Sequence, residues 1–257
     1  MQGMSPRRLS RPQRQHGVAL FIVIVFVMLS MLLAVSASRT SLFNEMVVGN
    51  DADYQRAFEA AQALLQDAEL DIRGETASGQ ACAAPPCRAY STALQFPTEA
   101  KEINALITAL NSETTKCKDG LCTRRTGRQD FWNYTAKTDP APSGLQAGEV
   151  TLEALTAEGV GARYGQFTGA QTGTSSTPAN PILADQTPGR GGWYWIEILP
   201  YSDKVKTANL IVDTTNSQLA LNLDVYVVYR ITALAYGRKE GSIAVLQETY
   251  ARQRRKD

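Results

Sequence analysis

The most pronounced pattern in this chain of 257 residues is a run of twenty uncharged, mostly apolar residues near its N-terminus. The run reads VALFIVIVFVMLSMLLAVSA and extends from Val18 to Ala37. A helix needs about 20 apolar residues to cross the hydrocarbon core of a bilayer. The run therefore predicts a membrane-spanning helix.

The helical pattern continues beyond the end of this run. Between Val18 and Arg73 the sequence contains no proline and a single glycine, Gly49. We predict one continuous helix over residues 18–73, roughly 80 Å long at ~1.5 Å per residue, apolar all round in its first half and amphipathic in its second. The apolar residues of the second half recur at three- and four-residue spacing: they are Tyr54, Ala57, Phe58, Ala61, Leu64, Leu65, Ala68 and Ile72.

The C-terminal part of the sequence has the pattern of a sheet. Residues 193–199 (WYWIEIL) predict a strand, and residues 223–236 and 242–251 predict a pair of strands. The five residues between this pair, 237–241, begin and end with glycine and are typical of a hairpin loop. The elements together predict an α+β fold, in which the long helix of residues 18–73 packs on an antiparallel sheet of at least three strands.

The segments between the helix and these strands give weaker patterns. Residues 98–110 have helical spacing with Thr98 as a candidate cap, and residues 149–155 are compatible with a strand. The stretch 168–192 is rich in Gly, Thr, Ser and Pro, which predicts a long exposed loop. The glycine-rich stretch 159–165 lacks the strand–turn–helix context of a phosphate-binding loop and is predicted to be a flexible loop.

Positive charge precedes the apolar run. Four arginines and no acidic residue lie in the first seventeen positions, which predicts a cytoplasmic N-terminus and an exported remainder. Three fates of the junction are open: a secretory signal cut after Val35-Ser36-Ala37, an uncut signal anchor, or a cut on the cytoplasmic side directly after Gly17. The uninterrupted helix beyond Ala37 favours the third, because it makes the apolar run half of a longer element. The arginines are Arg7, Arg8, Arg11 and Arg14.

Several segments of the sequence resemble those of a known family. The N-terminal part resembles the PilX group of type IV pilus minor pilins in four segments: the leader ending RQHG, the apolar run, the stretch SRTSLFNEMVVGN and the following FEAAQALLQDAE. Near the C-terminus, the segment VYRITALAYGRKEGSIAVLQETYARQ resembles that family's closing strands. The resemblance implies a leader of residues 1–17, cleavage after Gly17 by a prepilin peptidase and N-methylation of Val18. It also implies a transmembrane and filament-core helix over 18–73 and a periplasmic globular head over 74–257.

The same resemblance implies where the protein works and with what. The expected location is the inner membrane, with the N-terminus cytoplasmic and the head periplasmic, and later the pilus on the cell surface. The expected partners are other minor pilins, pilus tip proteins and the prepilin peptidase. Removing the four leader arginines from a net charge of +1 leaves −3, so we expect no nucleic-acid partner.

Two positions depart from the general pilin pattern. The first residue after the cut is Val18, where most pilins have phenylalanine. The fifth is Ile22, where major pilins carry a glutamate that is thought to neutralise the N-terminal amine of a neighbouring subunit in the filament core. An unpaired buried charge is costly, so a subunit without this acid suits a position where the pairing is not required. Ile22 therefore favours a tip or priming subunit, and also resembles the tip pseudopilin of type II secretion systems.

The four cysteines form two closely spaced pairs, Cys82 with Cys87 and Cys117 with Cys122. In an exported protein an even count favours disulfides over a four-thiolate zinc site. The turn-forming sequences inside the pairs, AAPP and KDGL, favour the local connections 82–87 and 117–122. A crossed connection between the two pairs stays open.

Nothing in the sequence indicates catalysis, and we expect no cofactor and no metal. The only histidine, His16, leaves with the leader, which removes histidine-based catalysis and metal sites from the mature protein. Of Trp193, Tyr194 and Trp195, one side is expected in the core and the other exposed. The acidic residues of the second helical half are expected to form a solvated face: Asp51, Asp53, Glu59, Asp67, Glu69 and Asp71.

The sequence thus predicts an assembly protein of the pilus rather than an enzyme. A membrane-anchored or secreted periplasmic binding domain, a type II secretion tip pseudopilin and an exported enzyme remain as alternatives.

Overall fold

The computed structural model describes residues 18–133, 149–173, 179–201, 223 and 225–253. The protein divides into two compact units, Met1–Asn50 and Asp51–Asp257. In the first unit the described residues are all part of one helix. The second unit contains the end of that helix and every strand of the described residues.

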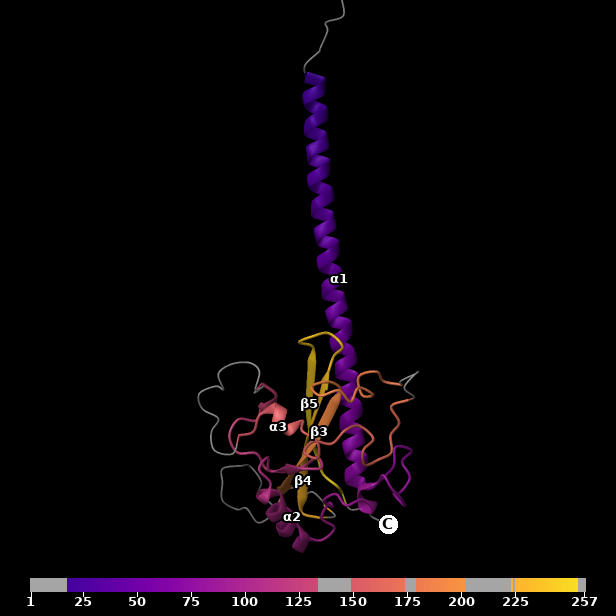
Figure 1. Ribbon diagram of the computed structural model, residues 1–257, viewed down its shortest axis with the longest axis vertical. Helices are drawn as coiled ribbons and strands as arrows, with labels where there is room; N and C mark the ends of the chain where they lie inside the picture. Colours follow the sequence, from indigo (N-terminus) through magenta and orange to yellow (C-terminus); the bar gives the residue numbers. More distant parts are fainter. Residues whose placement is uncertain (1–17, 134–148, 174–178, 202–222, 224, 254–257) are drawn as a thin grey trace, which may run out of the picture. The chain divides into compact units, whose positions relative to one another are not determined.

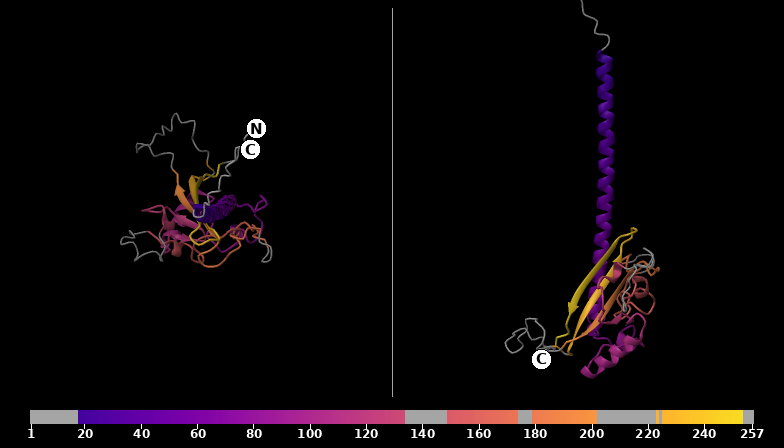
Figure 2. Two further views of the ribbon diagram at one scale, coloured as in Figure 1. Left: turned by 90° about the horizontal axis from the view of Figure 1, so that it is seen from above. Right: turned by 90° about the vertical axis from the view of Figure 1, so that its left-hand side faces the viewer.

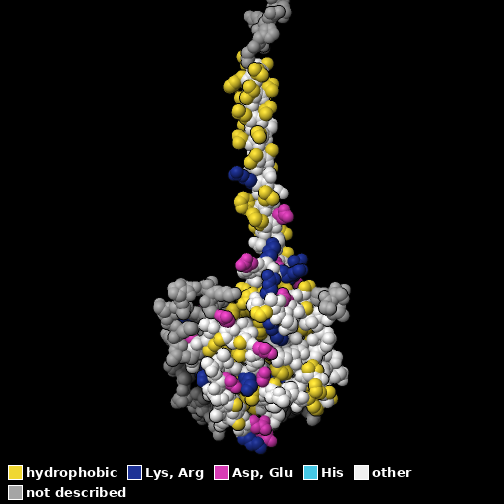
Figure 3. All heavy atoms as spheres, in the orientation of Figure 1, with side chains coloured by type: hydrophobic (Ala, Val, Ile, Leu, Met, Phe, Trp, Pro, Cys, Tyr) yellow, Lys and Arg dark blue, Asp and Glu magenta, His cyan; other side chains and the backbone are white. Residues whose placement is uncertain are grey.

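The long helix α1 extends from Val18 to Arg73 without interruption, as predicted (Figure 1). Almost every side chain from Val18 to Asn50 is exposed, and Figure 3 shows hydrophobic side chains gathered along the N-terminal part of the helix. Among the described residues, α1 is the one helix that is long and apolar enough to cross a membrane. The sequence Val18–Ala37 supplies this property.

The sheet of the second unit has the strand order β1-β2-β3-β4-β5. Figure 2 shows its long strands, coloured orange to yellow, side by side. Neighbouring strands are antiparallel except β2 and β3, which are parallel. The predicted α+β fold and the predicted hairpin are confirmed; the two short strands β1 and β2 were not predicted. The strands are β1 Cys117–Lys118, β2 Leu121–Thr123, β3 Gly192–Pro200, β4 Val227–Tyr236 and β5 Ile243–Tyr250.

One face of the sheet packs on the part of α1 that belongs to the second unit. Ala57, Ala61 and Leu64 of α1 share a buried cluster with Tyr194 of β3 and with the inner side chains of β4. Small side chains bring the helix close to the sheet. A Cβ atom on Gly192 would lie 2.6 Å from Leu64 Cδ1, so a larger residue there would displace the Leu64 side chain from its place against the sheet.

The opposite face of β3 is also covered, which contradicts the expectation of an exposed side. Trp193 and Trp195 lie in a second buried cluster with Phe131, Leu152 and Leu155, and both are at most 2% exposed. Segments without a strong pattern in the sequence supply this cover. The sequence of β3 alone therefore could not indicate that both faces of the strand are buried, because the residues that cover its second face lie in those segments.

Two helices of the second unit are short, and one of them corrects a prediction. The helix α2, Ala100–Ser112, confirms the predicted helix, but its N-cap is Glu99 rather than Thr98, in a capping box with Glu102. Residues 149–155 form no strand: they contain the helix α3, Leu152–Leu155. The Thr151 hydroxyl caps α3 by accepting the Ala154 N–H at 3.3 Å. Two single turns of 3-10 helix are η1, Arg88–Tyr90, and η2, Phe131–Asn133.

Two stretches predicted as loops are more tightly held than expected. In the glycine-rich stretch 159–165, the N–H and C=O of Ala162 pair with those of Tyr194, with N···O distances of 3.1 and 2.9 Å. In the stretch 168–192, Ile182 and Leu183 are buried in the core, so the described part is not simply an exposed loop.

Candidate functional site

The predicted processing junction lies at the start of α1. Val18 is the first described residue of the helix, and Gly17, His16 and the leader arginines lie outside the described residues. Val18 is 64% exposed and Ile22 46% exposed. Four positions apart on a helix, they lie one turn apart on the same side. The first turns of α1 therefore present a wholly apolar surface, suited to hydrocarbon or to an apolar interface between helices.

The other half of α1 is attached to the head by three buried aspartates, Asp53, Asp67 and Asp71, none more than 3% exposed. Asp67 and Asp71 lie fourteen and eighteen residues beyond Asp53. Both separations are close to whole numbers of helical turns, so the three side chains share the face that packs on the sheet. Each accepts hydrogen bonds from a different part of the head.

Asp71 binds the guanidinium of Arg88 in a buried ion pair. Arg88 Nε donates to both carboxylate oxygens at 2.9 and 3.1 Å, and Arg88 Nη2 donates to Oδ2 at 2.5 Å. The Tyr194 hydroxyl donates to the same Oδ2 at 3.1 Å. This network joins α1, the turn η1 and the central strand β3.

Further contacts complete the environment of Arg88. Its remaining donors bind the carbonyls of Leu94 and Asp119 at 3.1 and 2.9 Å, and its guanidinium lies 3.7 Å from the centre of the Phe167 ring. Burial alone lowers the pKa of Arg88, but the charge and hydrogen bonds of Asp71 outweigh burial and raise the pKa. Arg88 is therefore a permanently charged buried cation, and each of its three guanidinium nitrogens donates a hydrogen bond.

Asp67 is held by the segment that follows Ala162. Its Oδ2 accepts the N–H of Gly165 at 2.7 Å, and its Oδ1 accepts the hydroxyl of Thr168. Burial raises the pKa of Asp67 to about 6, although these hydrogen bonds act in the opposite direction. The nearby Asp71 adds to the increase.

Asp53 binds the loop between β4 and β5. Its carboxylate oxygens accept the N–H groups of Arg238 and Lys239, each at 3.0 Å. Burial raises the pKa of Asp53, but the two backbone donors and Ser242 outweigh it, so the pKa is lowered overall. The predicted hairpin loop is thus fixed to α1.

These contacts contradict the expectation that the acidic residues of the helix form a solvated face. Asp51 and Glu59 are exposed as expected, but the three aspartates are buried. A signal was present, because all three fall within the spacing of the apolar stripe. Their partners could not be read from the sequence, since Arg88, Thr168 and the loop donors lie in segments with no period.

The two cysteine pairs form local disulfides, Cys82–Cys87 and Cys117–Cys122. The second bond lies in the core cluster of Trp193 and Trp195, while Cys82 of the first is partly exposed. Within the described ranges, no group of three or more His, Cys, Asp or Glu side chains is placed to hold a metal ion.

Comparison with known protein families shows the family to which the chain belongs. The model described as PilX N-terminal matches residues 16–66, and the model described as type IV pilus assembly protein PilX C-term matches residues 118–252, more than half of the sequence. The chain belongs to the PilX family. The N-terminal match includes Gly17, Val18 and Ile22, and the C-terminal match includes strands β2 to β5.

PilX membership defines the general role. The protein is a minor pilin of type IV pilus assembly, and its partners are proteins of that machinery. The apolar helix α1 agrees with a membrane-anchored pilin. No curated protein and no solved structure matches the sequence.

Proposed function

We propose that this PilX protein is a minor pilin at or near the tip of a type IV pilus, where it primes assembly. It is made as a prepilin whose leader, residues 1–17, is removed after Gly17, and Val18 is then N-methylated. Residues 18–73 anchor the protein in the inner membrane and enter the filament core, and residues 74–257 form the periplasmic head.

The observation that carries this proposal is the apolar side chain of Ile22 in an uninterrupted apolar helix. In the pilin pattern this position holds the acid that pairs with the N-terminal amine of a neighbouring subunit. Isoleucine cannot form that pair, and an amine left unpaired in an apolar core is strongly destabilised. A subunit with Ile22 is therefore best suited to the end of the filament.

The anchorage of α1 supports an assembly role. Extraction from the bilayer pulls on the helix, and the three buried aspartates connect its second half to η1, the stretch 165–168 and the β4–β5 loop. Each connection joins residues far apart in sequence. The head and its portion of α1 therefore resist separation under load.

Electron microscopy of sheared filaments tests the proposal, using gold-labelled antibodies against residues 74–257 and a deletion strain as the control. We expect label at one filament end only, and fewer filaments in the deletion strain. Label spread along the shafts contradicts the tip position. Label confined to membranes, with normal filaments in the deletion strain, favours a membrane-anchored binding domain, and loss of protein secretion with intact pili favours a type II pseudopilin.

A further inference from the structure

Arg125, three residues beyond Cys122, is a cation whose end groups have no partner among the residues that the structure describes. Its Nη1 and Nη2 atoms are buried and make no hydrogen bond to this part of the protein. Its guanidinium lies 3.6 Å from the centre of the Phe131 ring. Stacking on a ring satisfies the face of a guanidinium and leaves the donors at its edge unsatisfied.

Glu197, the acid whose charge acts on Arg125, does not form an ion pair with the Arg125 side chain among the described contacts. Glu197 accepts the Nε and Nη2 donors of Arg230 at 2.6 and 2.8 Å, and its Oε1 also accepts the backbone N–H of Arg125 at 2.8 Å. Two guanidinium groups thus face one carboxylate, which is bonded to only one of them. Burial lowers the pKa of Arg125 to about 10, so the side chain still carries its charge at neutral pH.

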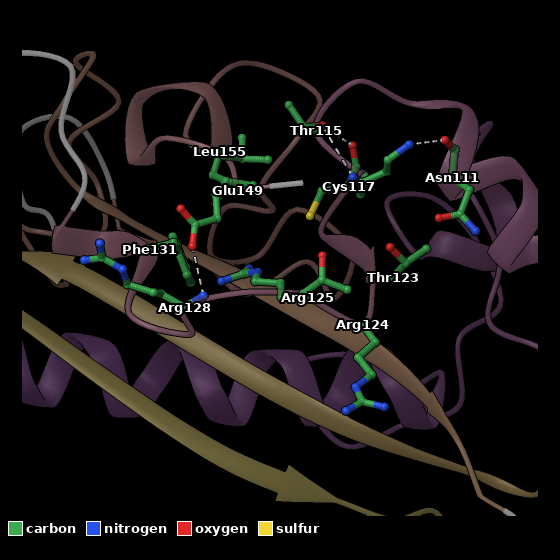
Figure 4. A pocket seen from close by; sticks show the side chains of 13 residues that line it. Asn111, Thr115, Cys117, Thr123, Arg124, Arg125, Arg128, Phe131, Glu149 and Leu155 are labelled. Atoms are coloured by element: carbon green, nitrogen blue, oxygen red, sulfur yellow. Dashed lines mark hydrogen bonds between the residues drawn. The ribbon is translucent and has the colours of Figure 1, made fainter. Parts of the chain in front are cut away.

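Arg125 lines a cavity of about 130 Å³ (Figure 4). Its lining includes three further cations, Lys116, Arg124 and Arg128, and one acid, Glu149, whose Oε1 accepts the Arg128 N–H at 3.1 Å. The remaining wall is largely apolar, and Figure 4 shows Phe131, Cys117 and Leu155 around the same space. The cavity combines an excess of positive charge with apolar walls and has room for several non-hydrogen atoms.

We propose that this cavity binds a carboxylate, held by the Nη1 and Nη2 edge of Arg125. A planar carboxylate matches the two parallel donors of a guanidinium. The apolar wall favours a carboxylate that carries a short alkyl group over a compact inorganic anion. Such a group can come from a small organic acid, an acidic side chain of another protein or the carboxyl terminus of a polypeptide.

Ligand titrations of the full-length protein in nonionic detergent micelles test this site. The signal is tryptophan fluorescence, because the Trp132 and Trp195 rings lie 5.3 and 5.1 Å from the Phe131 ring. The probes are sodium acetate, propionate and butyrate at constant ionic strength, with sodium sulfate as the inorganic comparison. We expect saturable binding that tightens roughly threefold to fourfold for each added methylene.

Two substitutions separate the proposed ligand from general positive charge. Arg125→Gln is expected to weaken butyrate binding about tenfold or more, because it removes both the positive charge and the pair of parallel N–H donors (the fork) of the guanidinium. Arg124→Gln removes an exposed cation of the same cavity and is expected to change the affinity less than about threefold. Butyrate should also raise the thermal midpoint of the wild-type protein and leave that of Arg125→Gln unchanged. A cooperative unfolding transition of Arg125→Gln in the same experiment verifies that the variant is folded. If Arg125→Gln does not fold, Arg125→Lys replaces it, with binding weakened because the fork is lost.

Comparison of probes identifies the source of the carboxylate. If butyrate binds most tightly, the natural ligand is a small organic acid. If N-acetylglutamic acid α-amide binds most tightly, the ligand is an acidic side chain of another protein. If N-acetylalanine binds most tightly, the ligand is the carboxyl terminus of a polypeptide. Each of these results supports the site. Equal binding of sulfate and butyrate, equal affinity of Arg125→Gln and wild type, or no saturable signal overturns it.

Discussion

Asp71 and Arg88 are seventeen residues apart in the sequence, and their side chains form a buried ion pair with an Nη2–Oδ2 distance of 2.5 Å. One residue lies near the end of α1 and the other in the turn η1. The Tyr194 hydroxyl binds the same carboxylate, so the pair also contacts the central strand. This pair is the most completely buried of the ion pairs among the described residues, and it connects the C-terminal end of α1 to the rest of the head.

Removing the acid from this pair should destabilise the head strongly. Asp71→Asn leaves the Arg88 cation buried without its counter-charge, which we expect to lower the free energy of unfolding by about 3–5 kcal/mol. Urea unfolding followed by tryptophan fluorescence measures the loss. The control is Glu59→Gln, an exposed acid of the same helix, which should change stability by less than about 0.5 kcal/mol.

Removing both charges together should cost much less. In Asp71→Leu/Arg88→Met no charge of this pair remains buried without a partner, so we expect most of the lost stability to return. A double variant as unstable as Asp71→Asn would show that the pair acts through its hydrogen bonds to Tyr194 and the loop carbonyls instead.

Asp67 should make stability depend on pH. Its pKa is raised from an ordinary value of 3.8 to about 6 in the folded protein. Between these values the folded state holds a proton that the unfolded state has lost. The contribution of Asp67 is therefore full at low pH and falls by about 3 kcal/mol as the pH rises through about 6.

The comparison of wild type with Asp67→Asn isolates this effect. Unfolding free energies measured between about pH 4 and about pH 7 should fall with pH in the wild type relative to the variant. Parallel curves for the two proteins would mean that Asp67 titrates at its ordinary value when folded.

The elements of this fold that could be predicted are those with a period. The apolar run from Val18, the stripe through Ala57 and Leu64 and the hairpin around residues 237–241 each carry a local signal, and the structure contains all three. The strands β1 and β2 are only two and three residues long, too short to show a period. β1 pairs with β2 across the local turn at Asp119 and Gly120, but β2 joins the sheet by pairing with β3, which is a long-range event.

The buried charges could not be predicted for the same reason. Asp71 and Asp51 are the same residue type on the same helix, but Asp71 is buried and Asp51 is exposed. The difference arises because the tertiary structure brings Arg88 and Tyr194 to the side chain of Asp71. Arg125 is similar, because its guanidinium stacks on Phe131 and Glu197 is bound by Arg230 instead, and neither contact can be read from a period in the sequence.

The disulfides should contribute unequally to stability. Closing a loop of this length is worth about 2 kcal/mol for either bond. We expect Cys117→Ala/Cys122→Ala to cost more than Cys82→Ala/Cys87→Ala, since Cys117 and Cys122 are both buried in the cluster of Trp193 and Trp195. Urea midpoints give the order, and a non-reducing peptide map should show the two local bonds. Any peptide joining Cys82 or Cys87 to Cys117 or Cys122 contradicts this connectivity.

Adding the missing acid should change where the subunit lies in the filament. Ile22→Glu supplies a carboxylate at the position where shaft subunits pair with a neighbouring amine, so gold label should appear along the shafts as well as at the end. Ile24→Glu places the same acid where no amine is expected, at a cost of about 2.5–3.5 kcal/mol in the apolar core, and should reduce incorporation. An end-only pattern for Ile22→Glu would show that another feature determines the position.

The most direct test of prepilin processing is intact-mass spectrometry of the mature protein from its native membrane and pili. We expect a protein that begins at Val18 and carries one added methyl group, and we expect Gly17→Val to prevent the cut and leave the leader in place. A mature protein that begins at Ser38, or a wild-type protein that still begins at Met1, would rule out processing after Gly17.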